Sequence, residues 1–191
     1  MGRLVMTSDL QQAKHPVSAV LAGPYGHPLH PILVTVPIGA WVASLVFDLA
    51  SHLVADPGFL ARGSLWLIGL GVVGALAAAL VGFLDLLAIP ARAPVFRIGL
   101  VHAVLNLAVT AGYLGGFLWR KTSDLSTSVG WGPLALSAAC LVALAVSGWL
   151  GGTLAFRYGV RVADEATQAS GYRHPLPRTQ QRPSGRADRG H

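Results

Sequence analysis

The sequence predicts an all-α membrane protein in which four transmembrane helices run up, down, up and down as one bundle, with both termini in the cytoplasm. Of its 191 residues, 53% are hydrophobic and 12% are charged, whereas an ordinary soluble domain has roughly 25% charged residues. Four long stretches carry almost no charge, and a helix needs about 20 apolar residues to cross the hydrocarbon core. The connections between them are short, which makes neighbouring helices antiparallel.

The position of each helix follows from where the charged residues interrupt the apolar stretches. The predicted helices cover residues 31–55, 63–89, 97–119 and 131–156. Asp48 interrupts the first helix, and Asp85 lies near the end of the second. These helices and their loops form a predicted transmembrane domain over residues 27–159. Residues 1–26 lack the apolar run of a cleaved signal peptide, so they are expected to stay as a cytoplasmic segment.

The basic residues predict the orientation. Eleven of the 14 Lys and Arg residues belong to the side that holds both termini and the loop between the second and third helices. The other three, Arg62, Arg120 and Lys121, are expected in loops on the opposite side. Cytoplasmic loops carry the excess of Lys and Arg, so both termini are predicted to be cytoplasmic.

The C-terminal residues 160–191 are predicted to form a basic, disordered cytoplasmic tail. Five arginines follow Gly171 in a Pro-containing stretch without apolar periodicity. Each arginine near the bilayer surface gains about 1 kcal/mol from anionic lipid headgroups. Topology and lipid contact therefore account for the net charge of +6, and no nucleic-acid partner is predicted. The lone Cys140 excludes a disulfide framework.

Small residues mark the packed face of the second helix. Gly71, Ala75, Ala78 and Gly82 recur at helical spacing, and the next step along the same face reaches Asp85. Helices in lipid associate where small residues allow close backbone approach. Asp85 is therefore expected to face the other helices and not the lipid.

The third helix carries a line of polar residues on one face. Its members are His102, Asn106, Thr110 and Tyr113.

Asp48 and His52 form a second, smaller polar spot toward the opposite membrane surface. At 1.5 Å per residue, Asp85, His102 and Asn106 fall in the same leaflet as His30, at the start of the first helix. Ionisable residues cost roughly 2.5 to 3.5 kcal/mol to insert and usually mark a functional site. A purely structural hydrogen bond between helices is the alternative reading.

Two His-Pro pairs precede the first helix, in residues 26–31. A proline at the first helical position is a common start signal, and each proline favours an extended conformation for the histidine before it. One pair is ordinary helix punctuation. Two pairs place His27 and His30 together at the mouth of the polar cluster.

These motifs resemble a bacterial family of predicted membrane proteins, catalogued as domain of unknown function 2231. The matching segments are GHPLHPILV at 26–34, PIG at 37–39, FDL at 47–49, GFLD at 82–85, IP at 89–90, and His102 with Asn106. The resemblance is strong over residues 26–120 and covers the fourth helix only in character. It implies a multi-pass protein of the bacterial cytoplasmic membrane.

The resemblance also implies a redox setting, because relatives are joined to Rieske iron-sulfur or cytochrome c domains. A Rieske-type or cytochrome partner is therefore an expectation by association only. This chain carries no such domain of its own, because one cysteine cannot ligate an iron-sulfur cluster and no C-x-x-C-H motif occurs.

Three functional hypotheses follow. The first is a small structural or accessory subunit without enzymatic activity, although an enzyme is not excluded. The second is an electron-transfer bundle in which His30 and His102 ligate a b-type haem, or bind a transition metal with Asp85. His27 would stand at its entrance, Gly82 and Gly99 would leave room for the flat ring, and Arg92 and Arg97 would pair with the propionates.

The third hypothesis is a proton or ion pathway through Asp85, His102 and Asp48.

Overall fold

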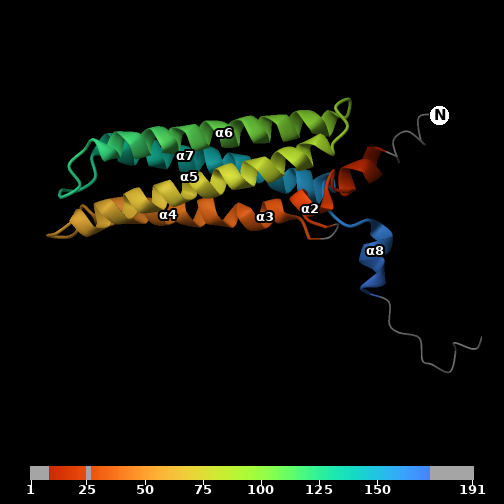
Figure 1. Ribbon diagram of the computed structural model, residues 1–191, viewed down its shortest axis with the longest axis horizontal. Helices are drawn as coiled ribbons and strands as arrows, with labels where there is room; N and C mark the ends of the chain where they lie inside the picture. Colours follow the sequence, from red (N-terminus) through yellow and green to blue (C-terminus); the bar gives the residue numbers. More distant parts are fainter. Residues whose placement is uncertain (1–8, 25–26, 173–191) are drawn as a thin grey trace, which may run out of the picture.

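A computed structural model describes residues 9–24 and 27–172 as a bundle of long helices (Figure 1). The first span consists of α3 (Leu29–Leu33) and α4 (Thr35–Ala50), separated by a turn at Val34. The other spans are α5 (Gly58–Leu87), α6 (Pro94–Lys121) and α7 (Trp131–Gly152), which continues as the π-helix η1 (Thr153–Arg157). Four helices in this part of the chain are thus long and apolar enough to cross a membrane, as predicted.

The helix boundaries differ from the predicted ones mainly at the charged residues used to place them. The first helix ends at Ala50 instead of residue 55, and α5 begins at Gly58 instead of residue 63. Arg62 lies within α5 but its side chain is exposed, so the helix tolerates the charge at its edge. The α6 helix likewise includes Arg97, Arg120 and Lys121. A charged residue therefore does not by itself end one of these helices.

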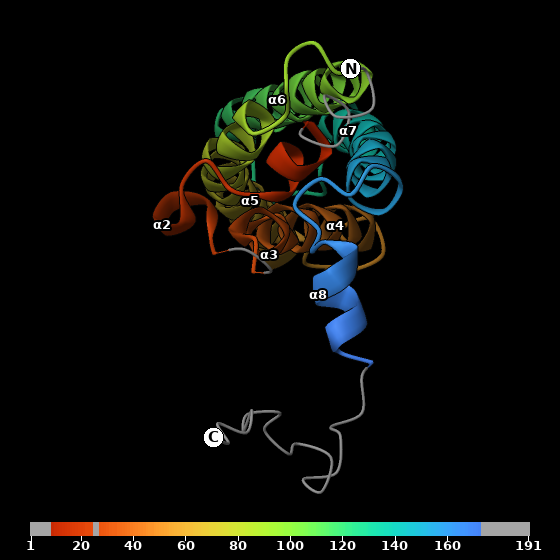
Figure 2. The ribbon, with the colours of Figure 1, turned by 90° about the vertical axis from the view of Figure 1, so that its right-hand side faces the viewer.

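The bundle has two ends that differ in which connections they hold. The far end holds the α4–α5 and α6–α7 connections. The terminal end holds the α5–α6 connection together with α2 (Ala19–Ala22) and α8 (Glu165–Ser170) (Figure 1). Figure 2 shows a short helical segment, residues 9–14, lying over the centre of the ring of long helices at the terminal end. The bundle is therefore covered at this end by residues that precede the transmembrane domain in the sequence and by residues that follow it.

The sequence predicts a disordered tail from residue 160 onward, but the structure places the first part of that range. Residues 160–172 are placed by the structure, Arg161 is buried, and α8 follows it. Residues 173–191, with the five tail arginines, lie outside the described residues.

An apolar core occupies the middle of the bundle. The rings of Trp41 and Tyr113 stack with their centroids 4.1 Å apart and their planes 9° from parallel. The Trp41 indole N–H donates to the Ile68 carbonyl at 3.3 Å, and the Tyr113 hydroxyl donates to the Ser137 carbonyl at 3.1 Å. This stack therefore contacts all four long helices and satisfies its own polar atoms.

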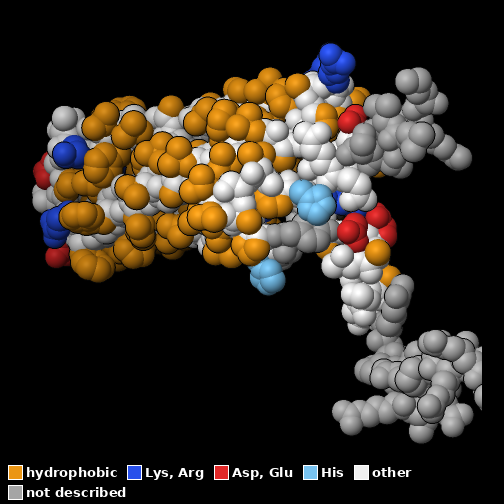
Figure 3. Space-filling model, turned by 45° about the vertical axis from the view of Figure 1, so that its right-hand side comes forward, with side chains coloured by type: hydrophobic (Ala, Val, Ile, Leu, Met, Phe, Trp, Pro, Cys, Tyr) orange, Lys and Arg blue, Asp and Glu red, His pale blue; other side chains and the backbone are white. Residues whose placement is uncertain are grey.

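The surface between the two ends is apolar. Figure 3 shows hydrophobic side chains over the middle of the bundle, with Lys, Arg, Asp and Glu side chains gathered toward its ends. Large side chains such as Trp66, Leu80 and Trp149 are at least 74% exposed. Helices that are hydrophobic on all sides are typical of a membrane span, where lipid covers the outer face.

We expect Gly71→Ala to lower the stability of the bundle, because a Cβ at this position would clash with the indole ring of Trp41. Overpacking of this kind costs about 1–3 kcal/mol. Gly115→Ala is the matched control, since a Cβ there would meet nothing within 4 Å and alanine favours a helix. Thermal unfolding in detergent measures both. Equal melting temperatures for the two variants would contradict this account of the core.

Candidate functional site

A buried ion pair joins the helices at the far end. Arg120, in the last turn of α6, donates from Nη1 to Asp48 Oδ1 at 2.7 Å and from Nη2 to Asp48 Oδ2 at 2.6 Å. Asp48 is 0% exposed and Arg120 is 2% exposed. Two parallel N–H···O bonds of this kind are the strongest form of an arginine–carboxylate pair.

The same guanidinium contacts the remaining helices. Its Nη1 lies 3.0 Å from the Ser64 hydroxyl of α5, which also donates to Asp48. Its Nη2 donates to the Pro133 carbonyl at 3.2 Å and to the Ser137 hydroxyl at 2.9 Å, both on α7. All four long helices therefore meet at Arg120.

This role of Arg120 was not predicted, because the residue was assigned to an exterior loop. Its spacing did contain a signal: Asn106, Tyr113 and Arg120 follow one another at seven-residue intervals, so they share a face of α6. His52 lies near Asp48 along the chain but does not join the pair. Its ring stacks on Trp131 with centroids 4.6 Å apart.

A second ion pair closes the terminal end. Arg161 Nε lies 2.8 Å from Asp85 Oδ1. Its Nη2 donates to the carbonyls of Ala22 at 2.9 Å and Gly23 at 3.1 Å, and its backbone N–H donates to the Ala13 carbonyl at 3.0 Å. Arg161 has a φ of +59°, a left-handed conformation that is uncommon for a side-chain-bearing residue. The end of α5 is thus tied to the N-terminal segment through one residue beyond α7.

An ion pair between the buried Lys14 and the exposed Glu165 reinforces this closure. Lys14 Nζ lies 3.0 Å from Glu165 Oε1, so the N-terminal helical segment also contacts α8. The backbone N–H of Glu165 and the Lys14 ammonium lower the pKa of the Glu165 carboxyl, since both stabilise its charged form. Glu165 is exposed, so this contact contributes much less than the buried pair beside it.

Two histidines face each other near the terminal end. His30 Nδ1 lies 2.9 Å from the Ala78 carbonyl of α5, and His102 Nδ1 lies 2.8 Å from the Ser147 carbonyl of α7. A carbonyl only accepts hydrogen bonds, so each Nδ1 must carry its proton. The ring centroids are 6.3 Å apart and the ring planes are 81° from parallel.

Only part of the predicted polar line of α6 forms one network. Asn106 Nδ2 donates to the His102 carbonyl at 2.9 Å and lies 3.2 Å from His102 Nε2. The Thr110 hydroxyl donates to the Asn106 carbonyl at 2.8 Å. Tyr113 belongs to the apolar core instead. The bonds of Thr110 and Tyr113 end on backbone carbonyls, which do not relay protons, so no chain of proton carriers joins the two ends through these residues.

Glycines on the facing helices provide space for the two imidazoles. A Cβ on Gly82 of α5 would lie 2.8 Å from the His30 ring, and a Cβ on Gly151 of α7 would lie 3.1 Å from the His102 ring. At Gly99 a Cβ would lie 2.8 Å from the Leu86 side chain. The space predicted for a haem ring at Gly82 and Gly99 therefore holds the His30 ring and the Leu86 side chain in this structure.

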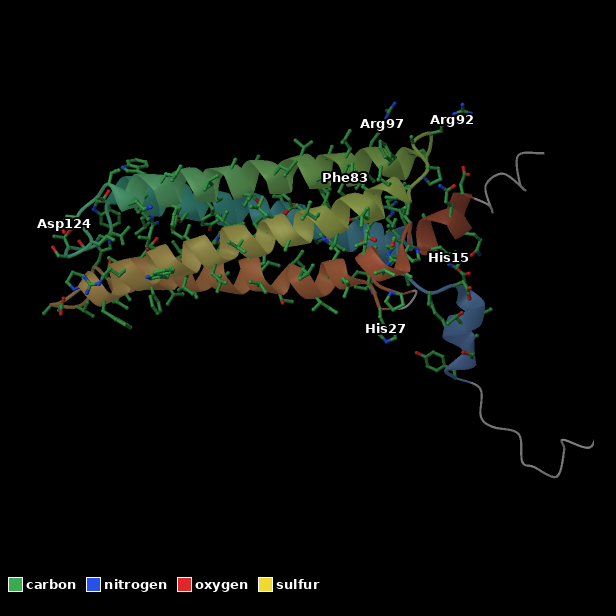
Figure 4. The ribbon with its side chains drawn as sticks, viewed as in Figure 1. His15, His27, Phe83, Arg92, Arg97 and Asp124 are labelled. Atoms are coloured by element: carbon green, nitrogen blue, oxygen red, sulfur yellow. The ribbon has the colours of Figure 1, made fainter. Side chains whose placement is uncertain are left out.

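The other residues predicted at the site do not take part in the contact between the two histidines. His27, Arg92 and Arg97 are exposed, and Figure 4 shows Arg92 and Arg97 extending away from the bundle. Asp85, predicted as a metal ligand, is paired with Arg161. Within residues 9–24 and 27–172, no group of three or more His, Cys, Asp or Glu side chains could hold a metal ion.

The sequence model of a family described as "Predicted membrane protein (DUF2231)" matches residues 26–164. Both buried ion pairs and both facing histidines lie within the matched range. No curated protein and no solved structure matches the chain.

We expect Asp48→Ala to destabilise the bundle strongly, because it leaves the Arg120 guanidinium buried without a counter-charge. Breaking a buried pair in this way costs about 3–5 kcal/mol. The double variant Asp48→Leu/Arg120→Met removes both charges and should recover much of the loss. Denaturant or thermal unfolding in detergent measures all three forms.

Lys121→Ala is the control for this prediction, because Lys121 is exposed one residue after Arg120. It should unfold like the wild type. If the double variant were as unstable as Asp48→Ala, the uncompensated charge would not be the cause of the loss.

Proposed function

We propose, on the premise that the chain belongs to the DUF2231 family of predicted membrane proteins, that it acts as a small structural or accessory membrane subunit without enzymatic activity. One observation carries the proposal: both acids at membrane depth are neutralised by buried arginines that join separate helices or segments. Charges paired in this way fix which helices and segments meet, and removing one partner of either pair would destabilise the bundle.

The packing between the ion pairs supports the same role. Trp41, Tyr113, Ile68, Val72 and Val109 form a buried cluster between the two ends. A proton or ion would have to pass these side chains to travel from Asp85 to Asp48. An ion pathway is therefore less consistent with the packing than a rigid scaffold, and a b-type haem is disfavoured because the glycine spaces are filled.

The setting in which the subunit works is proposed from sequence. The bacterial cytoplasmic membrane is its proposed location, with both termini in the cytoplasm. A Rieske-type or cytochrome protein is the proposed partner class, and it rests on the family resemblance alone. The arginines after Gly171 would contact anionic lipid on the cytoplasmic leaflet.

Replacing Asp85 by Asn should reduce stability without changing any transport activity. The variant leaves Arg161 without its counter-charge, which costs about 1–3 kcal/mol for a buried unsatisfied group. Glu165→Gln is the control, since Glu165 is exposed, and its melting temperature should change little. Proteoliposomes with the wild type should show no pH-driven flux above that of empty liposomes. Flux that Asp85→Asn abolishes would overturn the structural role in favour of an ion pathway.

The proposed orientation is testable by cysteine labelling in intact cells. Asp124 is exposed at the far end, so Asp124→Cys should react with a membrane-impermeant maleimide added outside. Arg178→Cys should react only after the membrane is permeabilised. Native Cys140 is buried and should give little background. The reverse labelling pattern would show that the termini lie outside.

A further inference from the structure

The two facing histidines have an arrangement that helix packing alone does not require. The contacts that join helices use Nδ1 of each ring, with His30 bound to α5 and His102 bound to α7. With the proton on Nδ1, the Nε2 of each neutral ring carries a lone pair. His30 Nε2 makes no hydrogen bond to the described residues, and His102 Nε2 has only the 3.2 Å contact with Asn106.

We propose that His30 and His102 form a binding site for one cuprous ion, coordinated by the Nε2 atoms of both rings. This inference goes beyond the structural role. An Nδ1–H bound to a backbone carbonyl is the arrangement that orients a metal-ligating histidine and raises its basicity. Here both rings have it, on two different helices.

The separation of the rings fits a single shared ion. A metal held at about 2.0 Å from an imidazole nitrogen lies about 3 Å from the ring centroid. Two imidazoles on opposite sides of one ion therefore have centroids about 6 Å apart, and the observed separation is 6.3 Å. The perpendicular ring planes do not oppose this, since each nitrogen binds through a lone pair in the plane of its own ring.

The rings are also held in place. The spaces at Gly82 and Gly151 admit the two imidazoles against the backbone of α5 and α7. Any larger residue at Gly82 would displace the His30 ring, whose atoms would lie 2.8 Å from the new Cβ. Both histidines are partly exposed, so the site is not sealed from an entering ion.

The ligand set selects the ion. Two neutral imidazoles are the available ligands, because the neighbouring acid, Asp85, is bound to Arg161. Zinc sites use at least three protein ligands in a tetrahedral arrangement, which this pair cannot supply. Imidazole binds copper well, and a monovalent d¹⁰ ion accepts two ligands and brings a single charge into the bundle. Binding involves no electron transfer, and each ring keeps its Nδ1 proton.

The test uses the full chain in detergent under anaerobic, reducing conditions, with Cu(I) delivered in competition with a chromogenic Cu(I) chelator. The wild type should bind one Cu(I) per chain. His30→Gln and His102→Gln should each weaken binding by more than about a hundredfold, which is beyond the roughly 10- to 100-fold effect of losing an outer-sphere partner. Glutamine keeps an N–H donor for the Ala78 or Ser147 carbonyl, and circular dichroism checks folding.

Matched variants separate this site from other copper ligands. His27→Gln and His52→Gln should bind like the wild type. So should Cys140→Ala, which removes the only thiol, although thiolate is a favoured Cu(I) ligand. Asn106→Ala should bind at least as tightly as the wild type, because it removes the amide that contacts His102 Nε2. X-ray absorption of the wild type should show two nitrogen ligands at about 2.0 Å, a readout that does not depend on the variants folding.

Three results would overturn the proposal. They are no stoichiometric Cu(I) binding by the folded wild type, unchanged binding in either glutamine variant that remains folded, and sulfur in the copper coordination shell. Zn(II) binding of equal affinity that is lost in the same variants would overturn the assignment of the ion.

Discussion

The ion pair between Asp48 and Arg120 is the constraint on which the rest of the bundle depends. Two charges with under 3% exposure are stable only if geometry and additional hydrogen bonds offset the cost of their desolvation. Ser64 of α5 provides one of those bonds, and Ser137 and the Pro133 carbonyl of α7 provide the others. These contacts form together only when all four helices are in register, so the pair selects one of the several packing arrangements that lipid could cover. The Arg120 Nε atom has no hydrogen-bond partner among the described residues.

Asp85 and Arg161 repeat this solution at the opposite end, with a different consequence. Arg161 lies beyond the last span, and its partners include backbone carbonyls of the N-terminal segment. The pair therefore covers the end of the bundle instead of joining the spans to one another. Both acids are thus occupied, with the Trp41–Tyr113 stack between them. His30 and His102 contact neither acid through a hydrogen bond, and each binds a backbone carbonyl through Nδ1.

Much of the site was predictable because helical spacing places residues of one helix on a common face. Asp85 does face the bundle, and His30 and His102 do meet across it. The prediction failed for the arginines. Counting Lys and Arg by loop treats every arginine as a surface charge, whereas its long side chain can reach back from a helix end to a buried acid. The sequence grouped Asp85 with the histidines and Asn106, and Asp48 with His52, whereas arginines bind both acids.

The sequence by itself determined the number of membrane spans, their antiparallel order and the faces on which they pack, because these properties depend on local composition and helical periodicity. The tertiary structure decided which polar groups pair. Arg120 is 72 residues from Asp48 along the chain, and no local pattern links them. Such a pair depends on helix register and side-chain reach, and these are set only when the whole bundle is assembled.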